Sequence, residues 1–89
     1  MAAVVTYDVD ARHVEVKNAM KEKGYSDFWT HNGQSYNLPN TTLYKPTATA
    51  ATALADIKAV AAAYRVRLER ALALDVGNWD AIPGDPHAR

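Results

Sequence analysis

The spacing of apolar residues changes near Asp10. Residues 3–9 read AVVTYDV, and their alternation and β-branched composition predict a half-buried strand. From Asp10 onward the apolar residues fall on one helical face, which predicts an amphipathic helix of about three turns. The residues that define this face are His13, Val16 and Met20.

Residues with the chemistry of helix ends flank this predicted helix. Asp10 is a candidate N-cap, because its carboxylate can accept a hydrogen bond from a backbone N–H of the first turn. Gly24 follows Lys21 and Lys23 and is expected to be the left-handed residue that ends the helix. His13 lies on the apolar side and is expected to be a hydrogen-bonded core residue.

Turn-forming residues interrupt an aromatic and β-branched segment in the middle of the chain. We expect strands near residues 26–31 and 41–45, separated by an extended loop that contains Pro39. Asn32-Gly33 is a strong signal for a type I′ turn, which pairs FWTH with QSYN in a hairpin. The sequence leaves open which of these segments pair in a larger sheet.

One more helix and one more strand are predicted in the second half of the chain. Residues 47–64 are rich in alanine and carry larger apolar residues at helical spacing. Residues 66–76 alternate, and Arg70 interrupts their apolar side, which indicates a bulge or a strand edge. The helical positions are Leu54, Ile57, Ala61 and Tyr64, and the strand positions expected to share one side are Val66, Leu68, Leu72 and Leu74.

The predicted order is strand, helix, strand, strand, helix, strand. With right-handed crossovers this order describes an α+β fold, the ferredoxin-like βαββαβ sandwich, in which two helices cover one face of a four-stranded antiparallel sheet. The single domain spans residues 1–89 and ends in an irregular tail, 77–89, that Trp79 and Ile82 are expected to anchor. The uncovered sheet face carries apolar groups, so we expect a homodimer in which a second copy covers this face or extends its edge.

Composition and charge narrow the classes of function. Ten basic residues balance ten acidic ones, so binding to RNA or DNA would need a local basic patch. The absence of cysteine excludes disulfides and thiolate chemistry, and no glycine-rich phosphate loop or dinucleotide fingerprint is present. No uncharged run approaches the ~18 residues of a membrane span. We therefore expect a soluble, cytoplasmic protein with no membrane partner.

About the first 30 residues carry a more specific resemblance. This segment has a strand ending in YDV, an acidic turn with Arg12, a helix reading VKNAMKEKGY that closes on Gly24 and a following aromatic strand. It resembles the start of the small ferredoxin-like proteins of CRISPR adaptation. Their superfamily includes virulence-associated protein D, a toxin. The remainder is similar in topology only, and HNGQSYNLPNTTLYKP is longer than the family's compact third strand.

This resemblance implies a role for Asp8. In the family, the aspartate that ends the first strand lies beside its dyad mate in a homodimer, where the pair can hold Mg²⁺ or Mn²⁺. Such a metal lowers the pKa of bound water and stabilises the charge that develops during phosphodiester cleavage. The alternative role of Asp8 is to end the strand and hydrogen-bond to the following turn.

Three other groups of residues are candidates for function. His31 lies at a strand–loop junction, where it is either a general acid or base or an exposed loop residue. A group of aromatic residues could stack on bases or pack in the core or a dimer interface; its members are Phe28, Trp29, Tyr36 and Tyr44. A basic group could contact phosphate, although nearby acidic residues favour cross-strand ion pairs; its members are Arg65, Arg67 and Arg70.

Two functions follow from these observations. The first is a dimeric nucleic-acid-associated protein, a metal-dependent endoribonuclease or endonuclease with Asp8 as metal ligand and with Asp8 and His31 as catalytic residues. The alternative is a non-catalytic binding or assembly module of the same fold, in which the sheet face and residues 32–40 recognise a protein partner. A toxin–antitoxin component would unite the two by using either activity or binding.

Overall fold

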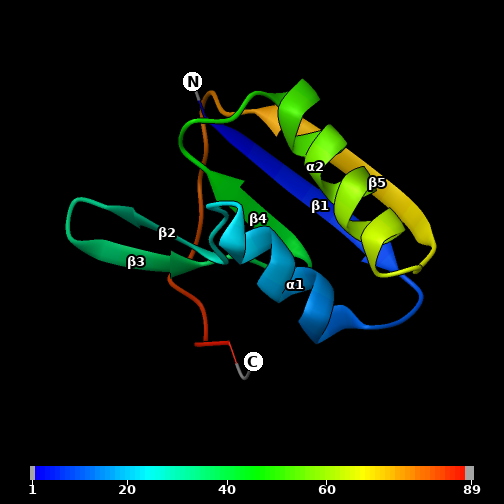
Figure 1. Ribbon diagram of the computed structural model, residues 1–89. Helices are drawn as coiled ribbons and strands as arrows, with labels where there is room; N and C mark the ends of the chain where they lie inside the picture. Colours follow the sequence, from blue (N-terminus) through cyan, green and yellow to red (C-terminus); the bar gives the residue numbers. More distant parts are fainter. Residues whose placement is uncertain (1, 88–89) are drawn as a thin grey trace.

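The computed structural model describes residues 2–87 and has an α+β architecture (Figure 1). Within this part of the chain, no helix has the length and apolar character needed to cross a membrane. The elements are β1 (Ala3–Val9), α1 (His13–Glu22), β2 (Phe28–His31), β3 (Gln34–Asn37), β4 (Thr42–Lys45), α2 (Ala50–Ala63) and β5 (Leu68–Asp75).

The strands form two sheets. β1 is the central strand of a three-stranded sheet of order β4-β1-β5, and it is antiparallel to both neighbours. α1 and α2 lie on one face of this sheet, as Figure 1 shows. β2 and β3 form a separate hairpin that projects from the side of β4 (Figure 1).

The predicted four-stranded sheet is therefore not the arrangement of the described residues. The segment expected to be the fourth strand joins β4 through a single bridge between Ser26 and Tyr44. Beyond Ser26 its backbone hydrogen bonds go to β3 instead, because the Asn32-Gly33 turn folds the chain back at once. The predicted pairing of FWTH with QSYN is confirmed, and Asn32 and Gly33 both have the positive φ of a type I′ turn, 50° and 79°.

The core lies between the three-stranded sheet and the two helices. Odd-numbered residues of β1 are buried against the helices, as the alternation predicts. The predicted face of α2 is confirmed, with Ile57 and Ala61 buried and Leu54 and Tyr64 packed at its margin. Other large side chains that are fully enclosed in this core are Met20, Leu43, Val5 and Val16.

The start of α1 differs from the prediction. The helix begins at His13, and its N-cap is Arg12, which has φ 55° and makes no side-chain cap. The Asp10 carboxylate instead accepts a hydrogen bond from the Arg67 backbone N–H at 2.9 Å, so it joins the β1–α1 loop to the start of β5. His13 is exposed and not a core residue, because the buried face of α1 consists of Val16, Lys17 and Met20. Gly24 has φ 98° and follows the helix end as predicted.

A β-bulge in β5 decides which side of the sheet its leucines occupy. Val9 lies opposite Leu68 and Asp8 lies opposite Arg70, so Glu69 is the extra residue. The bulge that Arg70 indicated is confirmed. The expectation that four apolar residues share one side was wrong, because Leu68 packs against the core whereas Leu72 and its neighbour Leu74 emerge on the opposite face.

Candidate interaction surface and the position of Asp8

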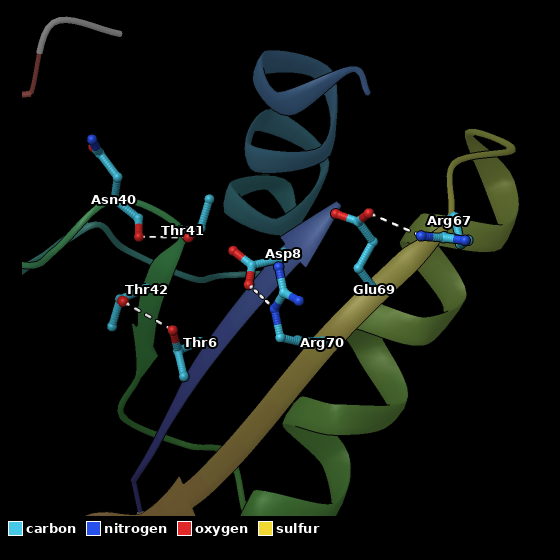
Figure 2. A network of polar contacts seen from close by, with 8 residues as sticks. All are labelled: Thr6, Asp8, Asn40, Thr41, Thr42, Arg67, Glu69 and Arg70. Carbon is cyan, nitrogen blue, oxygen red and sulfur yellow. Dashed lines mark hydrogen bonds and ion pairs between the residues drawn. The ribbon is translucent and has the colours of Figure 1, made fainter. Parts of the chain in front are cut away.

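One face of the three-stranded sheet has no helix over it. We call it the open face, and it consists of the side chains that point away from α1 and α2. The strand register places them in three rows across β4, β1 and β5: Tyr44, Val4 and Leu74; Thr42, Thr6 and Leu72; and Asp8 with Arg70. Figure 2 shows four of these residues, Thr6, Asp8, Thr42 and Arg70, side by side on the strands.

The open face is apolar at its β5 side. Leu72 and Leu74 are 55% and 54% exposed although both lie in a regular strand. The Thr42 hydroxyl donates to the Thr6 hydroxyl at 3.3 Å (Figure 2). The middle of this face therefore offers methyl groups and already paired hydroxyls, which is a surface suited to burial.

The ion pair between Asp8 and Arg70 lies at one end of the open face. Arg70 donates from Nε to Asp8 Oδ2 at 2.7 Å, across two neighbouring strands (Figure 2). The hydrogen bond from Arg70 to Asp8 and the negative charges of Asp8 and Glu69 raise the pKa of the Arg70 guanidinium, so it stays charged. The Arg70 side chain is 75% exposed and that of Asp8 47%, so water still reaches both groups. The expected cross-strand ion pair is confirmed at this position.

One oxygen of the Asp8 carboxylate is already engaged. Oδ2 accepts from Arg70, so a cation bound at Asp8 would share the carboxylate with a guanidinium. Among residues 2–87, no three His, Asp or Glu side chains come together in a group able to hold a metal ion. Mg²⁺ takes six oxygen ligands, keeps several of them as water and is usually held by one or two carboxylates.

His31 belongs to a different part of the molecule. Its ring lies edge-on to Trp79, with centroids 5.2 Å apart. Trp79 also contacts Trp29 at 4.8 Å and Tyr36 at 5.3 Å, and Trp29 lies on Tyr44 at 4.1 Å. We call these five residues the aromatic cluster.

The aromatic cluster and Asp8 occupy opposite ends of the sheet. Tyr44 pairs with Val4, and Asp8 lies four residues further along β1, about 13 Å away at ~3.3 Å per residue. His31 belongs to the Tyr44 end, because it contacts Trp79, which contacts Trp29, which lies on Tyr44. The structure therefore does not bring the two predicted catalytic residues, Asp8 and His31, into one site.

The predicted stacking residues divide between two environments. Trp29, Tyr36 and Tyr44 meet in the aromatic cluster, whereas Phe28 is 44% exposed elsewhere on the hairpin. Trp79 is the ring that joins this cluster, so the prediction that it anchors the tail is confirmed. Ile82 is 77% exposed, and the prediction that it is an anchor was wrong.

Hydrogen bonds hold the tail beside the hairpin. The Asn37 backbone N–H and its side-chain amide both donate to the carbonyl of Pro83, at 2.8 and 3.2 Å. A hollow of about 1010 Å³ lies between residues 37–40 and tail residues 80–87. Part of the 32–40 segment that the sequence proposed for partner recognition is thus occupied by the chain's own tail.

Asp27, Lys17 and Lys21 form an ionic cluster that the sequence did not predict. Asp27 Oδ2 lies 2.8 Å from Lys17 Nζ and 3.4 Å from Lys21 Nζ, and the Asp27 and Lys17 side chains are each only 11% exposed. Burial by itself would raise the pKa of the Asp27 carboxyl, but the hydrogen bond from Lys17 and the positive charges of Lys17, Lys21 and His87 lower it below its usual value. No clear signal for this cluster is present in the sequence, because the burial of Lys17 is evident only once Asp27 lies beside it.

A second polar contact ties α2 to the segment after α1. The Tyr25 hydroxyl donates to Asp56 Oδ2 at 2.8 Å. Burial and the Asp56 carboxylate together raise the pKa of the Tyr25 hydroxyl far above its ordinary value, so it remains a donor. Both contacts join the segment after α1 to a helix, which indicates a structural role.

Comparisons with protein-family models, with curated proteins and with solved structures found no match to this chain. The resemblance of its first residues to the proteins of CRISPR adaptation stays a prediction.

Proposed function

We propose that this protein is a non-catalytic assembly module whose open face binds a second copy of the chain. The observation that carries this proposal is the pair Leu72 and Leu74, which are more than half exposed on the β5 side of the open face. Contiguous apolar surface of this kind marks interaction sites in small soluble domains. A domain of 89 residues also has a small core and gains stability when it associates.

The charges of the open face favour a second copy over a nucleic acid. The face carries one acidic and one basic group, Asp8 and Arg70, so its charge is complementary to that of an identical face related by a two-fold axis. A phosphate backbone would need several unpaired cations. Arg67 and Arg70 are instead both paired with carboxylates, at 3.0 and 2.7 Å.

The bulge in β5 favours packing of the two faces over extension of the sheet edge. β5 is an edge strand, but its bulge at Glu69 interrupts the regular ladder that a strand of another chain would need. Charged residues at this end of the strand, Arg67 and Glu69, form their own pair at 3.0 Å (Figure 2). The leucines beyond the bulge remain available on the face.

We also propose that the fold is a reduced ferredoxin-like sandwich. The order of elements and the two helices on one face support this proposal, with the Ser26–Tyr44 bridge as the remnant of the fourth strand. The β2–β3 hairpin then takes the place that this strand would occupy beside β4.

The oligomeric state in solution tests the assembly proposal. Fully burying a leucine contributes about 1.5–3 kcal/mol, so burying the exposed half of four leucines in a dimer contributes roughly 3–6 kcal/mol. The double variant Leu72→Ser/Leu74→Ser is therefore expected to dissociate about 100- to 10,000-fold more readily than the wild type in sedimentation equilibrium.

Val14→Ser provides a matched control, because Val14 is 42% exposed on α1 and does not lie on the open face. This variant is expected to dimerise like the wild type. A wild-type chain that stays monomeric at a concentration of about 1 mM, where even weak dimers form, would overturn the proposal.

A metal-dependent nuclease is the second candidate function. It is favoured by one observation, the position of Asp8 on the same open face, so that a dimer through this face would bring in a second Asp8. Incubation with labelled RNA and DNA in Mg²⁺ or Mn²⁺ tests it directly. Cleavage by the wild type that disappears in Asp8→Asn supports the nuclease, and cleavage that persists in Asp8→Asn rejects this site.

A further inference from the structure

The ion pair of the open face lies where a second copy would bury it. We propose that in the dimer each Arg70 also hydrogen-bonds to Asp8 of the partner subunit, so that four charged groups form a closed ring across the two-fold axis. This inference rests on the proposed assembly and adds the geometry and the specificity of the interface.

Both members of the pair have unused hydrogen-bonding capacity. Arg70 makes one contact, from Nε to Oδ2 of Asp8, although a guanidinium has five N–H donors. Asp8 Oδ1 accepts no hydrogen bond from the described residues. The outward sides of both groups are thus free to contact a chain that approaches the open face.

If a dimer buries the open face, the unused donors and acceptors of Arg70 and Asp8 need new hydrogen-bond partners. An ion pair on the surface is satisfied by water, but burial removes that water, and the cost is offset only if the remaining donors and acceptors find partners. A second open face carries the matching groups, because its own Arg70 and Asp8 lack the same contacts. An apolar partner would leave them unsatisfied, so the ring selects a second copy.

The strand register supplies a geometry in which this happens. Asp8 lies opposite Arg70, Thr6 opposite Leu72 and Val4 opposite Leu74 on the neighbouring strands β1 and β5. Consider a two-fold axis that lies in front of the open face, parallel to the strands and midway between β1 and β5. This axis places β5 of one copy over β1 of the other. Packed sheets keep their strands within about 30° of each other, which this axis satisfies.

The same axis aligns the β1 and β5 members of each row. Arg70 then faces Asp8 of the partner subunit, and Leu74 faces Val4 of the partner subunit. Thr42, on β4, lies outside the overlapped strands. One placement therefore buries the leucines and closes the ring of charges.

Exchange of charge between chains tests the ring. Asp8→Arg gives the face two positive charges, and Arg70→Asp gives it two negative charges. Each single variant is expected to dimerise roughly 100-fold less tightly than the wild type or worse, because like charges then oppose each other across the interface. An equimolar mixture of the two variants is expected to form a heterodimer close to the wild type in affinity.

Disulfide trapping tests the placement independently of charge, since the chain has no cysteine of its own. A mixture of Leu74→Cys and Val4→Cys chains is expected to form an intermolecular disulfide under mild oxidation. A mixture of Leu74→Cys and Thr42→Cys chains is the control, which should form little, because both residues lie on the open face but only the first pair overlaps.

The outcomes separate this inference from the assembly proposal. Three results would each overturn the ring while leaving the dimer intact. The single charge variants could dimerise as tightly as the wild type, or their mixture could form no heterodimer. The third result is disulfide trapping that is as efficient with Thr42→Cys as with Val4→Cys. A monomeric wild type would instead remove the assembly proposal and the ring with it.

Discussion

The buried pair between Asp27 and Lys17 gives a sharp prediction about stability. Asp27→Asn keeps the shape of the side chain but removes the charge that Lys17 contacts at 2.8 Å and Lys21 at 3.4 Å. Removing one partner of a buried ion pair costs about 3–5 kcal/mol, and a hydrogen bond to a charged group contributes about 1.5–3 kcal/mol. The amide introduced by this substitution can still accept a weaker hydrogen bond, so we expect a loss of about 2–3 kcal/mol.

This loss is large for a chain of 89 residues, whose total stability is expected to be roughly 4–13 kcal/mol. Urea unfolding followed by circular dichroism measures it. With a slope of about 1 kcal/mol per molar urea, the midpoint of Asp27→Asn should fall by roughly 2–3 M at pH 7. Glu22→Gln on α1 is the control, because the described residues offer exposed Glu22 no ion pair, and its midpoint should not move.

The pH dependence of the stability difference between wild type and Asp27→Asn is a second test. The pKa of Asp27 is lowered in the folded state, so its contribution is fully present above the ordinary value of 3.8 and is lost as pH falls through the lower folded value. The difference in stability between wild type and Asp27→Asn should therefore shrink steadily below about pH 4. A midpoint shift under about 0.5 M at pH 7, or a difference that stays constant to about pH 3, would show that the ion pair does not stabilise the fold in this way.

Three further substitutions test the tail, the cap of α2 and the turn after α1. Trp79→Ala removes the ring that contacts Trp29 at 4.8 Å, and we expect a loss of about 2 kcal/mol in urea unfolding together with faster proteolysis of the tail; an unchanged cleavage rate would contradict the anchor. Thr49→Ala removes the side chain that accepts from the Thr52 N–H at 3.2 Å, which should cost about 1 kcal/mol in the same assay, and Thr49→Asp should retain the stability. Gly24→Ala forces a side chain into φ 98° with its Cβ 3.3 Å from Lys45, so a loss of about 1–2 kcal/mol is expected, and a neutral result would show that the turn relaxes.

The periodic elements could be predicted because their signals are local. The alternation of residues 3–9 and the helical spacing around Ile57 each reflect which side of an element is buried, and this is written in consecutive residues. The Asn32-Gly33 turn is equally local, since only residues that tolerate positive φ form it readily. For these segments the pattern and the structure agree.

The roles of single polar residues could not be predicted in the same way. Asp10 precedes a helix and has the chemistry of an N-cap, but it bonds to Arg67, which is distant in the sequence and adjacent only after β5 pairs with β1. Lys17 lies at a buried helical position because Asp27 folds back against it. In both cases the partner is brought near by tertiary contacts and not by spacing along the chain.

The open face likewise combines features that the sequence predicted with features that depend on strand pairing. Local burial patterns predicted the strands, the helices and the hairpin, and the order of these elements predicted one uncovered sheet face. What that face contains depends on how the strands pair, since a one-residue bulge at Glu69 turns Leu72 and Leu74 outward and sets Arg70 beside Asp8. Side chains alternate with a period of two, so a single extra residue in a strand exchanges its two faces, and the pairing with β1 fixes where that residue lies.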